Sequence, residues 1–131
     1  MPKNEADFVN ELMAKATEAH KHGRLVEAER FYSQALDKQP GLWDAQHLLG
    51  VLRSQQGRYQ EALALVGAAL KAKPDAVAAL TNYGLILHDL HKYESALAAF
   101  DKALAICPDN ALALNNRGSV LSALGRDRAA L

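Results

Sequence analysis

Apolar residues recur along the chain at the three- and four-residue spacing of amphipathic helices, and short polar breaks separate one helical stretch from the next. The breaks fall at proline corners and at a glycine or histidine followed by a basic residue, as at Gly23 and Gly57. Asn4 is placed to cap the first helix. The pattern predicts helices over residues 5–22, 25–38, 42–55, 59–72, 75–89, 93–106 and 110–123, then a stub from Asp127 after a break at Gly125 and Arg126.

The helical pattern repeats along the chain. Pro40, Pro74 and Pro108 are 34 residues apart, and the same period aligns columns of small or branched residues. The columns are Ala28, Ala62, Ala96 and Ala130; Ala35, Ala69 and Ala103; Leu36, Leu70 and Leu104; and Gly50, Gly84 and Gly118. Such a period is typical of a solenoid whose units bury their apolar faces only against their neighbours. We therefore predict one all-α domain over residues 1–131, with repeats at 9–42, 43–76 and 77–110 and a partial repeat at 111–131.

The small residues have a packing role. Glycine or alanine on the first helix of a repeat faces alanine on the second, so the two backbones should lie closer than the ~8–10 Å usual between helices. Tyr32 and Phe100 would then fill the gap to the next repeat. Leucine in place of Ala62 or Gly84 should overpack this contact and cost ~1–3 kcal/mol.

Composition narrows the classes of function. Lys plus Arg and Asp plus Glu both number 15, so no net charge favours nucleic acid or an anionic membrane. The single cysteine, Cys107, fits a reducing compartment and a passive packing role. The N-terminus lacks the apolar core of a signal peptide, and no stretch nears the ~20 apolar residues of a membrane span. We expect a cytoplasmic protein that binds neither nucleic acid nor membrane.

The columns resemble those of the tetratricopeptide repeat family. The family's small eighth position corresponds to Ala16, Gly50, Gly84 and Gly118, and its large aromatic twenty-fourth position to Tyr32, Val66 and Phe100. The chain departs from the family at the fourth position, where tryptophan is absent, and at the eleventh position of the second repeat, which is Arg53. The resemblance implies a right-handed α-solenoid of antiparallel helix pairs, with three full repeats and a truncated fourth.

The resemblance also implies a concave groove lined by the first helix of each repeat. Its side chains are mostly small, neutral polar or modestly apolar, which suits an extended peptide whose backbone pairs with amides and hydroxyls. The predicted peptide-binding groove residues are Asn10, Met13, Thr17, His20, Asp44, His47, Leu48, Val51, Thr81, Asn82, Leu85, His88, Asn115, Asn116 and Ser119.

Two asparagines in this set are one period apart. Asn82 and Asn116 resemble the asparagine ladder of O-linked N-acetylglucosamine transferases, which grips the substrate backbone. The corresponding residues of the first two repeats are Ala14 and Leu48, so a ladder would begin halfway. Two interpretations stay open: a peptide-gripping pair, or asparagines that lie on a solvated helix face.

The chaperone-binding members of the family suggest a different ligand. Their lysines, asparagines and arginine, which hold a C-terminal carboxylate, correspond here to Met13, Thr17, Leu48, Ala78 and Asn82. We therefore expect no capture of a chaperone's C-terminal tail.

We find no pattern for catalysis, metal or cofactor binding. The chain has no nucleophile elbow, glycine-rich phosphate loop or cysteine pair, and no two histidines have the spacing of a helical zinc site. Asp44 and His47 lie one helical turn apart, which on an exposed face indicates a surface pair.

The last repeat is incomplete, since Leu131 corresponds to the core residues Leu63 and Leu97. We expect either the N-terminal part of a longer protein or self-association through the bared flank of the last helix. That flank would expose Leu114, Val120, Leu121 and Leu124. The sequence thus favours a non-catalytic scaffold that binds a protein segment; the alternative is the substrate-recruiting N-terminal arm of a larger enzyme such as a glycosyltransferase.

Overall fold

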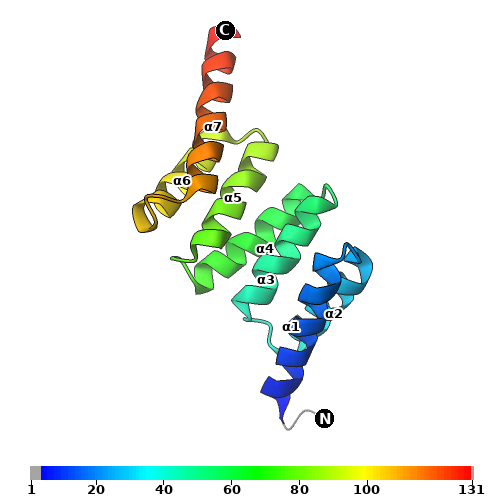
Figure 1. Ribbon diagram of the computed structural model, residues 1–131. Helices are drawn as coiled ribbons and strands as arrows, with labels where there is room; N and C mark the ends of the chain where they lie inside the picture. The colour runs from blue at the N-terminus through cyan, green and yellow to red at the C-terminus, as the bar shows by residue number, and fades with distance from the viewer. Residues whose placement is uncertain (1–3, 131) are drawn as a thin grey trace. The chain divides into compact units, whose positions relative to one another are not determined.

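The computed structural model describes the backbone of residues 4–130 and the side chains of residues 4–126. Within this range every regular element is an α-helix, and short turns join the helices (Figure 1). The helices are α1 (Glu5–Lys21), α2 (Leu25–Lys38), α3 (Trp43–Gln55), α4 (Tyr59–Ala72), α5 (Val77–Asp89), α6 (Tyr93–Ile106) and α7 (Ala111–Ala130). The predicted all-α class is confirmed, and the predicted helices α2, α4 and α6 have the observed bounds. Asn4 caps α1 as predicted, since its Oδ1 accepts from the Asp7 amide at 2.9 Å.

The first helix of each full repeat ends in the same motif. The amides of Arg24, Arg58 and Lys92 each donate to the carbonyl five residues earlier, at 2.9, 2.9 and 2.8 Å. This six-to-one bond requires a left-handed residue just before the donor. Gly23 and Gly57 supply it with φ values of 75° and 78°, whereas the third repeat uses His91 at φ 60°.

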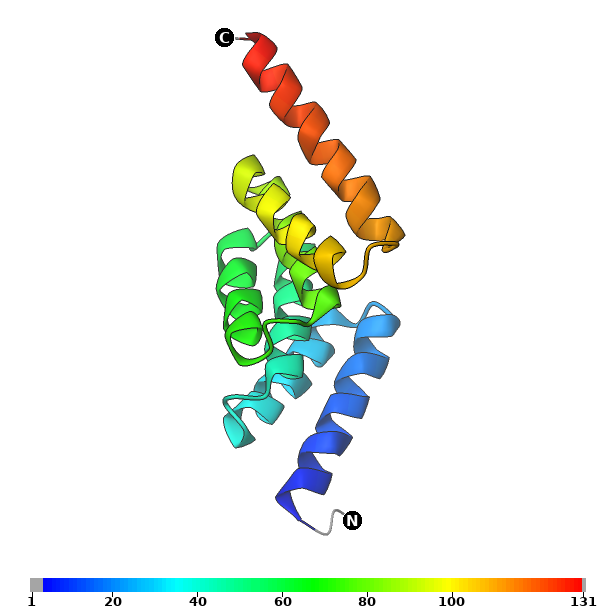
Figure 2. The same cartoon turned by 90° about the vertical axis from the view of Figure 1, so that its left-hand side faces the viewer.

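The break predicted at Gly125 and Arg126 was wrong, because α7 runs without interruption to Ala130. Continuing α7 through Gly125 adds one backbone hydrogen bond per residue, whereas a new helix after a turn would need its own unfavourable nucleation. In Figures 1 and 2 the C-terminal part of α7 extends beyond the helices it packs against.

The helices gather into two compact units, one over Met1–Ala72 and one over Lys73–Leu131. In the first unit, α1 pairs with α2, α3 pairs with α4, and α2 packs on α3. The core between α1, α2 and α3 is formed by Ala16, Ala19, Ala28, Tyr32, Leu49 and Leu52. The single-domain organisation remains a prediction.

Gly50 allows α3 and α4 to approach closely. A Cβ atom on Gly50 would lie 2.5 Å from Cγ2 of Val66 and 3.2 Å from the carbonyl oxygen of Ala62, both on α4. Real Cβ atoms do not come within about 3 Å of such atoms, so this close approach requires a glycine at position 50. Gly50 therefore faces Ala62 of the alanine column, as the sequence predicts. No side chain other than hydrogen fits there without displacing a neighbour.

Arg53 joins three helices of the first unit. Its Nη1 lies 2.7 Å from Glu29 Oε1 on α2, and its Nε lies 3.4 Å from Glu61 Oε2 on α4, which also pairs with Arg58 at 2.7 Å. The Arg53 side chain is only 13% exposed. The departure from the family's usual apolar residue is therefore accompanied by two carboxylates that compensate its charge.

In the second unit α5 pairs with α6, and α7 packs on α6 and more lightly on α5. Phe100 of α6 lies against Gly84 of its own repeat, where a Cβ would come 2.6 Å from the ring. Asn110 Oδ1 accepts from the Ala113 amide at 3.0 Å and caps α7. Arg117 of α7 bonds Asp101 of α6 at 2.6 Å.

One residue of the predicted bare flank was assigned to the wrong side of α7. Val120 is fully buried, whereas Leu114 and Leu121 are 49% and 43% exposed and Leu124 is half-buried. Val120 lies on the same helical stripe as the buried Ala113, seven residues earlier, so it belongs to the face that packs on the second unit.

None of the helices in the described part of the chain has the length and apolar content needed to span a bilayer.

Candidate binding surface

In the first unit, the predicted groove residues lie on α1 and α3 and differ in accessibility. Asn10, Thr17 and Asp44 are exposed, while Met13, His20, Leu48 and Val51 are half-buried. His47 is only 6% exposed. The accessible part of this set combines polar groups with partly covered apolar side chains, which is the composition expected of a peptide-binding surface.

His20 connects three helices of the first unit. Its Nδ1 lies 3.0 Å from the hydroxyl of Tyr32 on α2, and its Nε2 lies 2.7 Å from Oε1 of Gln55 on α3. In the tautomer with hydrogen on Nε2, the ring donates to Gln55 and accepts from the tyrosine hydroxyl. The rings of His20 and Tyr32 also meet edge to face, with centroids 5.8 Å apart. The sequence identified His20 but not its partners, since nothing in the repeat pattern marks Gln55 or the tyrosine hydroxyl as polar contacts.

Asp44 acts on the buried polar groups nearby. Burial and, to a smaller extent, the Asp44 carboxylate together raise the pKa of Tyr32 to about 12. Burial lowers the pKa of His47 below its usual value, and Asp44 partly opposes this shift. Both side chains are consequently neutral at neutral pH, while Asp44 itself is exposed.

In the second unit, the hydroxyl of Thr81 serves its own helix. Thr81 is buried, and its Oγ1 donates to the Val77 carbonyl at 2.9 Å. Ser119 Oγ likewise donates to the Asn115 carbonyl at 3.3 Å, although both of these residues are exposed. These hydroxyls can therefore offer a ligand mainly their acceptor lone pairs.

The two asparagines of the suggested ladder lie on α5 and α7, which pack within the second unit. Both are half-buried, as are Leu85 and His88. The Nδ2 of Asn116 is shielded from solvent and has no hydrogen-bond partner. A buried donor without an acceptor costs ~1–3 kcal/mol, so this amide is a polar group that a ligand carbonyl or a rotation could satisfy. The sequence could not reveal this, because burial of one amide atom depends on local packing.

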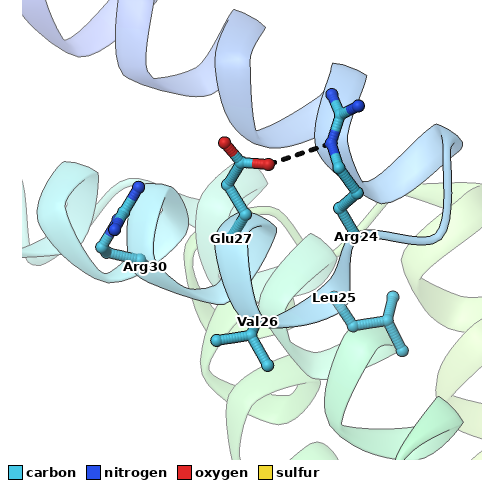
Figure 3. A pocket seen from close by; sticks show the side chains of 5 residues that line it. All are labelled: Arg24, Leu25, Val26, Glu27 and Arg30. Atoms are coloured by element: carbon cyan, nitrogen blue, oxygen red, sulfur yellow. Dashed lines mark ion pairs between the residues drawn. The ribbon is translucent and has the colours of Figure 1, made fainter.

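Two hollows on the first unit lie outside the predicted groove residues. One is lined by Arg24, Leu25, Val26, Glu27 and Arg30, where Arg24 Nε pairs with Glu27 Oε2 at 2.9 Å (Figure 3). A second hollow extends from there over α1 to Phe31, whose ring lies 5.3 Å from the Arg30 guanidinium and 5.9 Å from Lys15 Nζ. The sequence did not predict them. Both are open depressions in which the cations already contact an acid or an aromatic ring, so they lack the converging unpaired groups of a specific site.

Cys107 has the chemistry of a passive thiol. Its Sγ donates to Asp109 Oδ1 at 3.4 Å, and this hydrogen bond raises the pKa of the thiol. Reactive cysteines show the opposite shift. Among the described residues, no group of three or more His, Cys, Asp or Glu side chains is arranged to hold a metal ion.

Comparisons with known proteins agree on the fold. The chain is similar to an O-GlcNAc transferase from Thermobaculum terrenum, with 27% identity and a TM-score of 0.87 over 92% of this chain and 23% of that one. It therefore spans about a quarter of the transferase. It is also similar to the first TPR of Spaghetti (RPAP3) bound to the HSP90 peptide SRMEEVD, with 20% identity and a TM-score of 0.85 over 89% of this chain and 95% of that one. The Sgt2 TPR domain from Aspergillus fumigatus gives 17% identity and a TM-score of 0.86, over 92% of this chain and 82% of that domain.

The last two likenesses show the fold alone. A search of curated protein sequences finds no match. Two sequence models described as tetratricopeptide repeat match residues 47–111 and 99–131, which together cover the chain from His47 onward. With its paired helices, small-residue contacts and these matches, the chain belongs to the tetratricopeptide repeat family.

Proposed function

We propose that the chain is a non-catalytic interaction scaffold that binds an extended peptide or protein segment along the first helices of its repeats. The observation that carries this proposal is the surface of α3, where exposed Asp44 is followed by half-buried Leu48 and Val51. Such a surface offers apolar contacts for alternate ligand side chains and polar groups for orientation. The likeness to an RPAP3 domain bound to an HSP90 peptide supports this use of the fold. The carboxylate-holding residues of the chaperone-binding members are replaced here, so we propose another ligand.

Selection from a phage-displayed library of random dodecapeptides tests this proposal. A Leu48→Ser, Val51→Ser variant removes the apolar part of the surface, and Val26→Ser on α2 is the control, because Val26 is 80% exposed outside it. We expect peptides selected on the wild type to bind the control unchanged and to lose at least tenfold in affinity for the double variant, since each buried methylene contributes ~0.8 kcal/mol. A library that yields no binder, or binders that tolerate the double variant, would contradict the proposal.

The second candidate is a substrate-recruiting arm of a larger enzyme such as a glycosyltransferase. The likeness to the Thermobaculum terrenum transferase and the position of Asn82 and Asn116 on packed helices favour it. If these asparagines grip a ligand backbone, replacing both with alanine should weaken selected peptides whatever their sequence. The arm hypothesis fails if mass spectrometry of the protein from its own cells gives 14.2 kDa, the mass of this chain alone.

We further propose that the free face of α7 supports self-association. Leu114 and Leu121 are exposed, and Gly118 between them has no neighbour within 4 Å of a built Cβ. Light scattering should detect a dimer that Leu121→Glu abolishes, and a monomer at millimolar concentration would refute self-association.

The unpaired thiol of Cys107 also leads us to propose a cytoplasmic location, which cell fractionation tests.

A further inference from the structure

Asp44 differs from the other carboxylates that surround α3. Glu27, Glu29 and Glu61 each contact an arginine of the first unit. Asp44 is exposed, and no lysine or arginine among the described residues forms an ion pair with it. Its charge is therefore left to solvent or to a ligand.

The side chains that share a face with Asp44 are apolar. Leu48 and Val51 follow it at four and seven residues, so all three lie along one stripe of α3. Both are half-buried, and Leu48 packs against the core around Tyr32. A lysine or arginine laid along this stripe would place its aliphatic stem on Leu48 and its cationic head at Asp44, which is how such side chains divide themselves between apolar and polar surroundings.

The two buried groups that Asp44 influences do not compensate its charge. His47, one turn along α3, has a pKa lowered by burial, and Tyr32 has a pKa of about 12, so both are neutral. Asp44 raises the pKa of both groups, as a nearby negative charge does. The imidazole of His20 is already bonded on both nitrogens to neutral partners.

We propose that Asp44 is the specificity-determining residue of this surface and selects ligands that carry a lysine or arginine side chain there. This inference rests on the proposed function and names its ligand class: a segment with a basic residue whose stem lies on Leu48 and whose charge pairs with Asp44. The preferred ligand group is positively charged, whereas a captured terminal carboxylate is negatively charged.

Asp44 also lies in the first turn of α3, where an acidic side chain interacts favourably with the helix dipole. That role alone would affect folding and not ligand choice. The two roles are separated by measuring thermal stability and peptide preference on the same variants. Asp37 of α2, another exposed aspartate, provides the matched control.

The experiment repeats the dodecapeptide selection on the wild type, Asp44→Asn, Asp44→Lys and Asp37→Asn. We expect one ligand position to be enriched in lysine and arginine with the wild type and Asp37→Asn, unselective with Asp44→Asn, and enriched in acidic residues with Asp44→Lys. Replacing the selected lysine with methionine and replacing Asp44 with asparagine should each weaken binding roughly fivefold to tenfold, and the two together no further.

The outcomes separate this inference from the proposed function. Binders with no basic preference, or a preference unchanged in Asp44→Asn, overturn the role of Asp44 while leaving a peptide-binding scaffold. A library that gives no binder to any variant overturns both. A variant that loses binding together with its helical circular dichroism is replaced by Asp44→Ser, which removes the charge and keeps a small polar side chain in the first turn of α3.

Discussion

Gly50, Gly84 and Gly118 occupy the same position in three repeats, yet replacement with alanine should destabilise the protein at only some of them. At Gly84 the new Cβ would lie 2.6, 2.7 and 2.9 Å from three atoms of the Phe100 ring, which is itself fully buried. The ring must shift within a close-packed core, at a cost of ~1–3 kcal/mol. Alanine recovers ~1 kcal/mol of helix propensity over glycine, so the net loss should be ~0–2 kcal/mol. At Gly118 nothing lies within 4 Å, and only the propensity gain remains.

We therefore expect Gly118→Ala to be more stable than the wild type by ~1 kcal/mol and Gly84→Ala to be less stable than Gly118→Ala by ~1–3 kcal/mol. Gly50→Ala should resemble Gly84→Ala, because Cγ2 of Val66 would lie only 2.5 Å away. Urea unfolding followed by circular dichroism measures these differences, and hydrogen exchange of α5 and α6 assigns the Gly84 effect to the second unit. Shrinking the neighbour with Phe100→Leu should reduce the penalty at Gly84. Equal stability of Gly84→Ala and Gly118→Ala would refute the close approach.

Arg53→Ala should destabilise the first unit by ~1–3 kcal/mol, since it removes the arginine that pairs with Glu29, while Glu61 keeps its pair with Arg58. Arg53→Leu should cost less by restoring an apolar contact, and urea unfolding followed by Trp43 fluorescence compares the two variants. His91→Gly should stabilise the second unit by about 1 kcal/mol in thermal melts, because φ 60° is costly for a residue with a Cβ, and a loss of stability would contradict that strain. Tyr32 ionises at a higher pH when folded, so stability should fall as the pH rises from 10 towards 12, and Tyr32→Phe should lack this loss. Conversely, the lowered pKa of His47 means that stability falls as the pH drops below 6.5, which His47→Gln should abolish.

The period of the sequence was sufficient to predict the elements and their pairing. Proline and glycine mark the turns through their local backbone preferences. The bounds predicted from them for α2, α4 and α6 agree with those observed. The prediction failed where the outcome depends on packing against a neighbour. Position 125 is a glycine, like the turn positions 23 and 57, but α7 continues through Gly125. The sequence alone predicts Val120 to be one more apolar residue on the exposed flank of the last helix. Its burial results from the packing of α7 within the second unit.

The sequence predicts which positions form the candidate surface, but not the burial or the charge state of the side chains there. The repeat register assigns Asp44, His47 and Leu48 to one face, but it does not say that His47 is buried and neutral while Asp44 is exposed. The contact between His20 and Gln55 joins residues 35 positions apart, which a pattern of period 34 has no means of selecting.

Similarity of backbone therefore carries little information about the ligand of this chain. An RPAP3 domain bound to an acidic HSP90 peptide matches it with a TM-score of 0.85. Ligand choice in a helical repeat depends on a few side chains per helix, which can change sign without moving the backbone. Here the carboxylate-holding positions of the chaperone-binding members carry Met13, Thr17 and Leu48, and α3 carries the acidic Asp44 four residues before Leu48. An HSP90-type acidic peptide should consequently bind more weakly to the wild type than to Asp44→Lys, and the reverse order would show that the charge at this position does not set the preference.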